Sequence, residues 1–177
     1  MSDLTLLGLP GALRAGSTNR QLLRNAARLM GDVDYIEADL ALPLYDGDVE
    51  ARGIPAEVTR LAEQIAAADA VVISTPEYNK SLSGVLKNAL DWVSRTPDKP
   101  WAGKPVALMS AAAGRSGGER GQSALLLAMM PFRARIVAGP EICLADARNQ
   151  FDADGRLVNE RTEKNLGLLM EALMAAV

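Results

Sequence analysis

Residues 8–23 contain the side chains best suited to bind an anion. A glycine-rich turn leads into Ser17, Thr18 and Asn19, residue types that commonly cap the start of a helix. A helix N-terminus offers unpaired backbone N–H groups and about half a positive charge. The neighbouring Arg14 adds a full cation. Together these residues predict a phosphate site.

The glycine spacing in this stretch narrows the kind of phosphate. Gly11 and Gly16 match the ends of a G-x-x-x-x-G-K-[ST] loop, but Ser17 occupies the lysine position, which disfavours triphosphate hydrolysis. A G-x-G-x-x-G fingerprint does not occur, and Pro10 has no backbone N–H to offer a pyrophosphate. A single terminal phosphate is therefore favoured. The alternative is an ordinary strand-to-helix turn with a capped helix and a solvated arginine.

A second unusual stretch, residues 75–79, is suited to a flat ligand. Pro76 restricts the backbone, Tyr78 offers an aromatic ring, and Glu77 and Asn79 add polar groups that can contact heteroatoms. In the alternative interpretation Tyr78 packs on the surface and Asn79 helps Ser81 to cap the following helix. If the fold brings the two stretches into one crevice, a phosphate and a planar ring together would describe flavin mononucleotide (FMN).

The composition limits the chemistry that the chain can perform unaided. The 177 residues contain no histidine, which excludes Ser-His-Asp and Cys-His catalysis and imidazole metal ligands. Cys143 is the only cysteine, so no internal disulfide can form, and we interpret it as a buried small hydrophobic residue. An enzyme of this composition would take its reactive group from a bound cofactor.

The charge and the apolar pattern limit the partners and the location. A net charge of −3 gives no broad attraction to nucleic acid or to an anionic membrane. No apolar stretch reaches the length of a membrane span, and residues 1–4 carry no basic region of a signal peptide. We expect a cytoplasmic protein that acts on small molecules.

Apolar runs alternate with helical patterns along the chain, which predicts one α/β domain over residues 1–177. The expected strands are residues 4–7, 34–38, 70–74, 106–110 and 134–138, the last with a candidate extension through 141–144. The expected helices start at Ser17, Ala56 and Ser81, run through 125–129, and start again at Glu160. We interpret residues 39–55 as a long loop and residues 152–155 as a structural turn.

Five strands of this kind form a doubly wound parallel sheet with helices on both faces and the common strand order 2-1-3-4-5. Ligands of this fold bind where the winding reverses, at the carboxyl ends of strands one and three. The loops at that point are residues 10–18 and 75–81, and residues 110–118 should form the neighbouring wall. The topology thus brings the two unusual stretches together.

Both stretches resemble the NADPH-dependent FMN reductase family, whose fold is flavodoxin-like. Residues 11–22, GALRAGSTNRQL, resemble its G-S-x-R-x-x-S-x-N-x-x-L opening, and residues 75–92 resemble its T-P-E-Y-N-x-S-x-x-G-x-L-K-N-x-x-D-W signature. Residues 42–46 and 117–122 also match, so the similarity covers nearly the whole chain. It is closest to the chromate- and quinone-reducing branch.

The resemblance implies a role for each matching residue. The FMN phosphate would be held by Arg14, Ser17, Thr18 and Asn19. The ribityl chain and the isoalloxazine ring would contact Pro76, Glu77, Tyr78 and Asn79, with Ser110 and Gly114 on the other side of the ring. Arg95 would stand at the entrance with Tyr78 and attract anionic acceptors. Ala12 replaces the usual serine, so one phosphate hydroxyl is lost.

We therefore expect an FMN-dependent oxidoreductase that takes hydride from NADH or NADPH and reduces quinones, flavins, chromate or similar acceptors in a ping-pong scheme. The resemblance also implies a homodimer or homotetramer, with residues 81–93 and 39–55 as candidate interface elements. Three alternatives remain: a flavodoxin-like electron carrier, a nucleoside-processing transferase with Glu77 as nucleophile, and a non-catalytic nucleotide-binding regulatory protein.

Overall fold

The computed structural model describes residues 4–177. The strands are β1 (Thr5–Pro10), β2 (Asp34–Glu37), β3 (Ala70–Thr75), β4 (Pro105–Ala111), β5 (Arg135–Ile136) and β6 (Cys143–Leu144). The α-helices are α1 (Thr18–Met30), α2 (Gly47–Ala51), α3 (Ala56–Ala67), α4 (Gly84–Val93), α5 (Glu119–Met129) and α6 (Glu160–Met174). Two short 3-10 helices are η1 (Met130–Phe132) and η2 (Ala147–Asn149).

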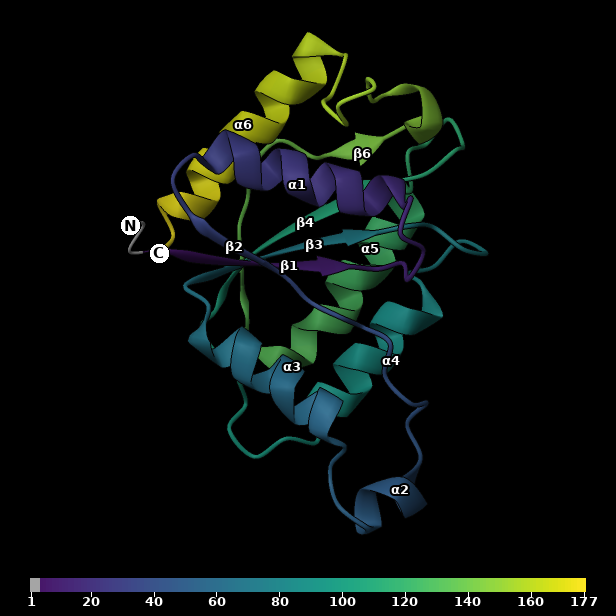
Figure 1. The fold of residues 1–177 in the computed structure, drawn as a ribbon, viewed down its shortest axis with the longest axis vertical. Helices are drawn as coiled ribbons and strands as arrows, with labels where there is room; N and C mark the ends of the chain where they lie inside the picture. The colour runs from purple at the N-terminus through teal and green to yellow at the C-terminus, as the bar shows by residue number, and fades with distance from the viewer. Residues whose placement is uncertain (1–3) are drawn as a thin grey trace.

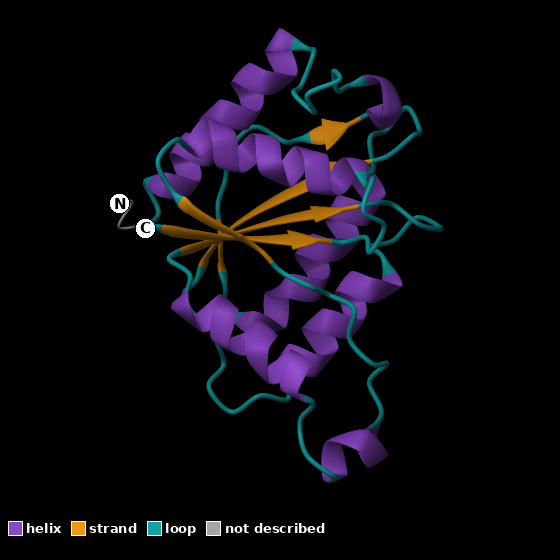
Figure 2. Cartoon of the chain, viewed as in Figure 1, coloured by secondary structure: helices purple, strands orange, loops and turns teal. Residues whose placement is uncertain are grey.

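The strands form a parallel sheet in the order β2-β1-β3-β4-β5, which confirms the predicted doubly wound topology. The winding reverses at β1, which pairs with β2 on one side and with β3 on the other. Helices α1 and α6 cover one face of the sheet, and α3, α4 and α5 cover the other (Figure 1). Figure 2 shows the strands as one layer between these two layers of helices.

The central strand β3 explains how the layers are held together. All six of its residues are buried, as expected for a parallel strand covered on both faces. Val72 belongs to the core cluster that includes side chains of α1 and α6, whereas Val71 and Ile73 belong to the cluster beneath α3 and α4. Within residues 4–177, no helix combines the length and the apolar character needed to cross a membrane.

The first strand is longer than the sequence indicated. The expected strand at residues 4–7 continues through Gly8 and Leu9 to Pro10, which pairs with Ser74 of β3. Gly8 does not mark a turn here: a Cβ at this position would lie 2.5 Å from the hydroxyl oxygen of Tyr35. The glycine therefore makes room for a tyrosine ring packed across β1.

The sheet edge beside β4 differs from the expected fifth strand. Instead of one strand over 134–138, two short strands pair with opposite ends of β4, so the sheet has six strands. Arg135 is in register with Pro105, and Cys143 is in register with Ser110. Pro140 lies in the intervening segment, and because proline has no N–H it cannot continue a ladder there.

The expected long loop at residues 39–55 contains the short helix α2. Asp46 caps it, and its side chain accepts a hydrogen bond from the backbone N–H of Asp48 at 2.8 Å. Asp46-Gly47-Asp48 therefore begins a helix rather than only a turn. In Figure 1 this segment projects away from the two helical layers.

The cap of α4 also differs from the expected one. Ser83, not Ser81, caps this helix: its hydroxyl oxygen accepts from the backbone N–H of Leu86 at 3.2 Å. The starts of α1 and α6 agree with the sequence, since Ser17 and Asn159 provide their caps. The turn at 152–155 is confirmed, because Oδ1 of Asp152 accepts hydrogen bonds from the backbone N–H groups of Asp154 and Arg156.

Candidate functional site

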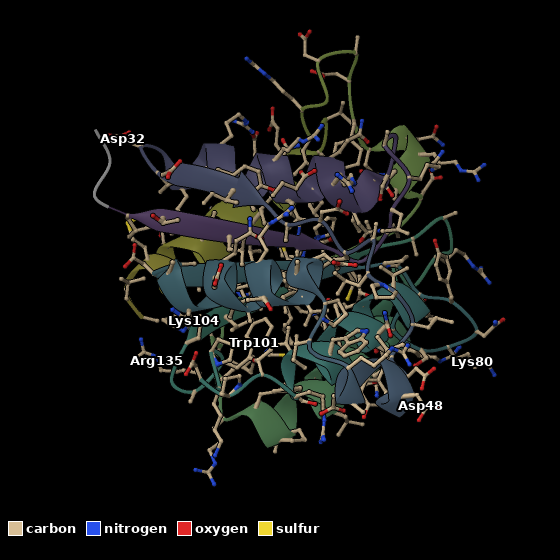
Figure 3. All side chains as sticks on the ribbon, turned by 60° about the horizontal axis from the view of Figure 1, so that its bottom comes forward. Asp32, Asp48, Lys80, Trp101, Lys104 and Arg135 are labelled. Carbon is tan, nitrogen blue, oxygen red and sulfur yellow. The ribbon has the colours of Figure 1, made fainter. Side chains whose placement is uncertain are left out.

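A cavity of about 570 Å³ lies at the carboxyl ends of β1, β3 and β4. Three loops supply most of its walls, the same three that the topology placed at the switch point. In Figure 3, Lys80 marks this end of the molecule, and Lys104, just before β4, lies at the opposite end. The lining residues that carry charges are Arg14, Glu77 and Arg148.

The loop after β1 is fixed to the neighbouring strand before it enters α1. The backbone N–H of Gly11 donates to the carbonyl of Ser74 at 2.8 Å. A Cβ on Gly11 would lie 3.0 Å from the same carbonyl oxygen and from Cδ of Pro76, so a side chain there would push the first two loops apart. The glycine thus allows close approach of the loops that line the cavity.

The start of α1 presents the predicted phosphate-binding groups to the cavity. Ser17 is its N-cap, and its hydroxyl oxygen accepts from the backbone N–H of Asn19 at 3.2 Å. The hydroxyl proton of Ser17 and the side chain of Thr18 remain to donate to a ligand. Arg14 is exposed and lines the same cavity, with no ion pair to any residue of the described chain.

Asn19 also lines the cavity, but its side-chain amide is directed into the protein. Its Nδ2 donates to the carbonyl of Ala111 at 3.0 Å, and its Oδ1 accepts from the Ser74 hydroxyl at 2.8 Å and from the Ala111 N–H at 3.1 Å. Only 3% of Asn19 is exposed. These bonds join the first turn of α1 to β3 and β4, and they hold the predicted phosphate-binding turn in place.

The loop after β3 forms the second wall. Pro76, Glu77 and Tyr78 all line the cavity, as the sequence predicted. The Oε2 atom of Glu77 accepts from the backbone N–H groups of Arg120 and Gly121 at 3.1 and 3.3 Å. These amides belong to the first turn of α5, where a carboxylate is favoured by the helix dipole. Glu77 therefore anchors the second loop to α5.

A tight turn presents Tyr78 to solvent. Tyr78 and Ser81 form an antiparallel bridge, and the two residues between them have positive φ angles of 51° for Asn79 and 65° for Lys80. Asn79 tolerates this left-handed conformation better than most residues, and it is not among the residues that line the cavity. Tyr78 is 58% exposed beside the cavity, so one side of the site is open.

The third wall is formed by the loop after β4. Gly114 lines the cavity, whereas Ser110 is fully buried behind it. The Ser110 hydroxyl lies 2.9 Å from the carbonyl of Gly117 and 3.2 Å from Oε1 of Gln122. Gly117 has a positive φ of 63°, and a Cβ there would overlap the carbonyl group of Cys143. Ser110 therefore shapes the loop from below.

Arg95 lies outside the set of residues that line this cavity. Its Nε is 2.9 Å from Oε1 of Glu50, whose other oxygen accepts from the Tyr45 hydroxyl at 2.8 Å. The hydrogen bond from Tyr45, followed by that from Arg95, lowers the pKa of the Glu50 carboxyl. The structure thus places Arg95 at the end of α4 in contact with the segment that contains α2.

Cys143 is half-buried rather than fully buried. Its Sγ lies 3.3 Å from Oε1 of Gln122, and burial is the main cause that raises its pKa. A raised pKa keeps the thiol protonated, which disfavours a nucleophilic role. The residue does not line the cavity.

Sequence reasoning missed part of the cavity wall, including Val85, Ala147 and Arg148, whereas Ser116 falls within the predicted third loop. Val85 follows the helical spacing of α4 and gave no separate signal. Ala147 and Arg148 belong to η2, beyond the last strand, and no motif marks them. Arg148 is brought to the cavity only by the path of the chain after β6.

The cavity has the features that a mononucleotide requires. Its volume lies within the range of ligand sites, a capped helix start and Arg14 provide for a phosphate, and Pro76 and Tyr78 provide an apolar and aromatic wall. These features fit FMN. The fold and the site together define a flavodoxin-like protein with its ligand crevice at the topological switch point.

Comparisons with known proteins give the family. The chain belongs to the NADPH-dependent FMN reductase family, whose model matches residues 4–149. It is 43% identical to an NAD(P)H-dependent FMN reductase of Pseudomonas aeruginosa over 97% of this chain and 94% of that protein. It is 40% identical to a quinone reductase of Escherichia coli over 92% of this chain and 89% of that protein.

A solved structure agrees with this assignment. The flavoenzyme NAD(P)H:(acceptor) oxidoreductase FerB of Paracoccus denitrificans superposes with a TM-score of 0.86 at 29% identity, covering 98% of each chain. The family makes FMN the cofactor and NAD(P)H the co-substrate, and the protein is a flavin-dependent oxidoreductase.

Proposed function

We propose that the cavity at the switch point binds FMN with its phosphate at the start of α1 and its ring between the second and third loops. Arg14, the Ser17 hydroxyl and the Thr18 side chain contact the phosphate. Pro76 and Tyr78 contact the ring from one side and Gly114 from the other. The observation that carries this proposal is the convergence of these groups on one cavity of sufficient volume.

Three predicted contacts take a different form in this proposal. Asn19 positions the phosphate-binding turn through its bonds to β3 and β4, and Ser110 positions the third loop through Gly117. Asn79 forms the turn that presents Tyr78. These three residues act through others, which is consistent with their burial or their positive φ angle.

When bound, FMN accepts a hydride from NAD(P)H and passes the electrons to a second substrate. The chain's own residues bind and orient the reactants. The exposed Tyr78 leaves one side of the ring accessible, so nucleotide and acceptor use the same opening in turn. This arrangement needs no histidine or cysteine nucleophile, in agreement with the composition.

We propose quinones as one class of acceptor, because relatives that share about 40% of the sequence are named quinone reductases. Free flavins and chromate are further candidate acceptors of the same open site. Arg95 is exposed outside the cavity and forms an ion pair with Glu50. We propose that it attracts anionic acceptors from solvent toward the opening of the site.

We also propose a cytoplasmic homodimer or homotetramer. Leu44 is 81% exposed and Tyr45 is 41% exposed in the segment before α2, and this segment projects from the body of the protein (Figure 1). Large apolar side chains in this arrangement favour a protein partner. Sedimentation of the purified protein as a strict monomer would overturn this part of the proposal.

Initial-rate kinetics test the proposed reaction. With NADPH and a soluble benzoquinone as the varied substrates, alternate use of one opening predicts parallel double-reciprocal lines. Intersecting lines in the same assay would show that both substrates bind together, and would rule out the shared opening. A protein that holds FMN yet oxidises neither NADH nor NADPH would support the electron carrier instead.

A further inference from the structure

We propose that Arg148 is a second cation for the FMN phosphate, beside Arg14. This inference rests on the proposed placement of the phosphate at the start of α1. Both arginines line the same cavity, but they arrive on different loops, after β1 and after β6. Of these two arginines, only Arg14 lies in a sequence motif of the site.

The backbone around Arg148 is held in place by contacts of its neighbours. Asp146 has a positive φ of 47°, and its two carboxylate oxygens accept from Nδ2 of Asn149 at 3.1 and 3.0 Å. The backbone N–H of Ala147 donates to the carbonyl of Ala112 at 3.1 Å, and Ala147 is 1% exposed. The η2 turn is therefore fixed to the third loop, and Arg148 has a defined position on the rim.

This position is on the phosphate side of the cavity. Ala112, which anchors η2, follows Ala111, and Ala111 is bonded to Asn19 in the first turn of α1. Figure 1 shows the segment after β6 beside the start of α1. Glu77 and Tyr78 stand on the loop after β3. The η2 turn that carries Arg148 is thus joined, through the hydrogen bonds of Ala112 and Ala111, to the helix start at which the phosphate is placed.

The charges around the cavity favour an anion there. Glu77 is the one acidic residue in the lining, and its carboxylate already accepts two N–H groups from α5. Arg14 and Arg148 have no ion pair within residues 4–177. Two unpaired guanidinium groups on one cavity match the charge of a phosphate dianion, whose second pKa is about 6.

Arg148 also accounts for the departure at residue 12. Ala12 lacks the hydroxyl that the family motif supplies to the phosphate, yet the residue lines the cavity. The Arg148 guanidinium on the same cavity can replace that hydroxyl with a charge-assisted hydrogen bond. The second cation thus offsets the missing hydroxyl of residue 12.

Titration of the flavin-free protein with FMN and with riboflavin tests the proposal, because riboflavin lacks the phosphate. We expect Arg148→Gln to weaken FMN binding by about five- to tenfold in flavin-fluorescence titrations and to leave riboflavin binding unchanged. Arg148→Lys, which keeps the charge, should retain most of the FMN affinity. Arg115→Gln is the matched control: this exposed arginine of the third loop is not in the cavity lining, and its variant should bind FMN within about twofold of the parent.

Arg14→Gln distinguishes a failure of the proposed phosphate placement from a failure of the proposed role of Arg148. If Arg14→Gln loses the preference for FMN over riboflavin and Arg148→Gln keeps it, the role of Arg148 is overturned and the phosphate placement stands. If neither variant changes that preference, the phosphate placement itself fails. An Arg148→Gln variant with unchanged FMN affinity but a raised KM for NADPH would assign this arginine to the nucleotide instead. Arg148 is exposed and has no side-chain partner among residues 4–177, so the variant should unfold at the same temperature as the parent.

Discussion

The hydroxyl of Ser74 donates a hydrogen bond of 2.8 Å to the side-chain oxygen of Asn19, inside the protein and beneath the cavity. Ser74 lies near the end of β3, and Asn19 lies in the first turn of α1. The same oxygen accepts from the N–H of Ala111 in β4. One side chain thus sets the position of the helix start relative to two strands. The proposed phosphate-binding turn is therefore fixed to the sheet by side-chain hydrogen bonds.

Replacement of Asn19 should cost stability and cofactor affinity together. Asn19→Ala leaves the Ser74 hydroxyl and the Ala111 backbone groups without a partner, which predicts a loss of roughly 2–4 kcal/mol in the free energy of unfolding. Ser74→Ala removes one bond of the set and should cost roughly 1 kcal/mol. Urea unfolding of the flavin-free proteins measures both values. Equal losses in the two variants would show that the bonds from Asn19 to Ala111 add nothing to stability beyond the bond to Ser74.

Glu77 distinguishes the reductase from a nucleoside-processing transferase. As an anchor that accepts from two amides of α5, Glu77 can be replaced by glutamine at a cost of roughly 1 kcal/mol of stability. We expect Glu77→Gln to retain NADPH oxidation within about tenfold of the parent. A transferase with Glu77 as nucleophile would instead oxidise no NADPH in the parent protein. A near-complete loss of NADPH oxidation in a folded, flavin-loaded variant would contradict the structural role.

Two glycines of the third loop should respond very differently to alanine. At Gly117 the positive φ and the overlap with the Cys143 carbonyl predict a loss of roughly 3 kcal/mol or more for Gly117→Ala. At Gly114 a Cβ meets no atom within 4 Å, so the free energy of unfolding of Gly114→Ala should lie within roughly 0.5 kcal/mol of that of the parent. Thermal unfolding of the flavin-free proteins is the measurement, and a harmless Gly117→Ala would refute the geometry of this wall.

The ion pair between Glu50 and Arg95 should stabilise the protein only where the carboxylate is ionised. Because the folded-state pKa of Glu50 is lowered, this contribution is present above the ordinary glutamate range and is lost as the pH falls through the lowered value. The unfolding free energy of the parent should exceed that of Glu50→Gln at about pH 7, and the difference should shrink as the pH falls below the ordinary glutamate range.

A matched variant controls for general charge effects in this pH series. Glu171 is exposed on α6 and has no ion pair within the described residues. Glu171→Gln should therefore show no comparable difference from the parent at any pH of the series. A difference for Glu50→Gln that did not change with pH would exclude the ionised carboxylate as its source.

Much of this site was accessible from the sequence because local signals and topology agree there. Ser17 is a cap both by residue type and in the structure, and the two unusual loops meet because parallel strands end at one edge of the sheet. The sequence predicts a strand that ends before Gly8, but the structure places Gly8 inside β1. Nothing in this segment of the sequence shows that the ring of Tyr35 packs against the glycine.

Other features depend on contacts between distant segments. Arg148 carries no local signal, because η2 reaches the cavity through the N–H of Ala147 and the carbonyl of Ala112. The inward direction of the Asn19 amide depends likewise on the ends of β3 and β4. Residue types can indicate a phosphate site, but the direction of each side chain follows from tertiary packing.

The visible absorption spectrum of the purified protein, before and after anaerobic addition of NADPH or NADH, tests the central claim most directly. An FMN reductase predicts flavin absorption bands that bleach when either nucleotide is added, and the faster donor identifies the preferred one. Flavin bands that survive both nucleotides would contradict the reductase activity and leave an electron carrier. A colourless protein that takes up no added FMN would contradict the assignment of the cavity itself.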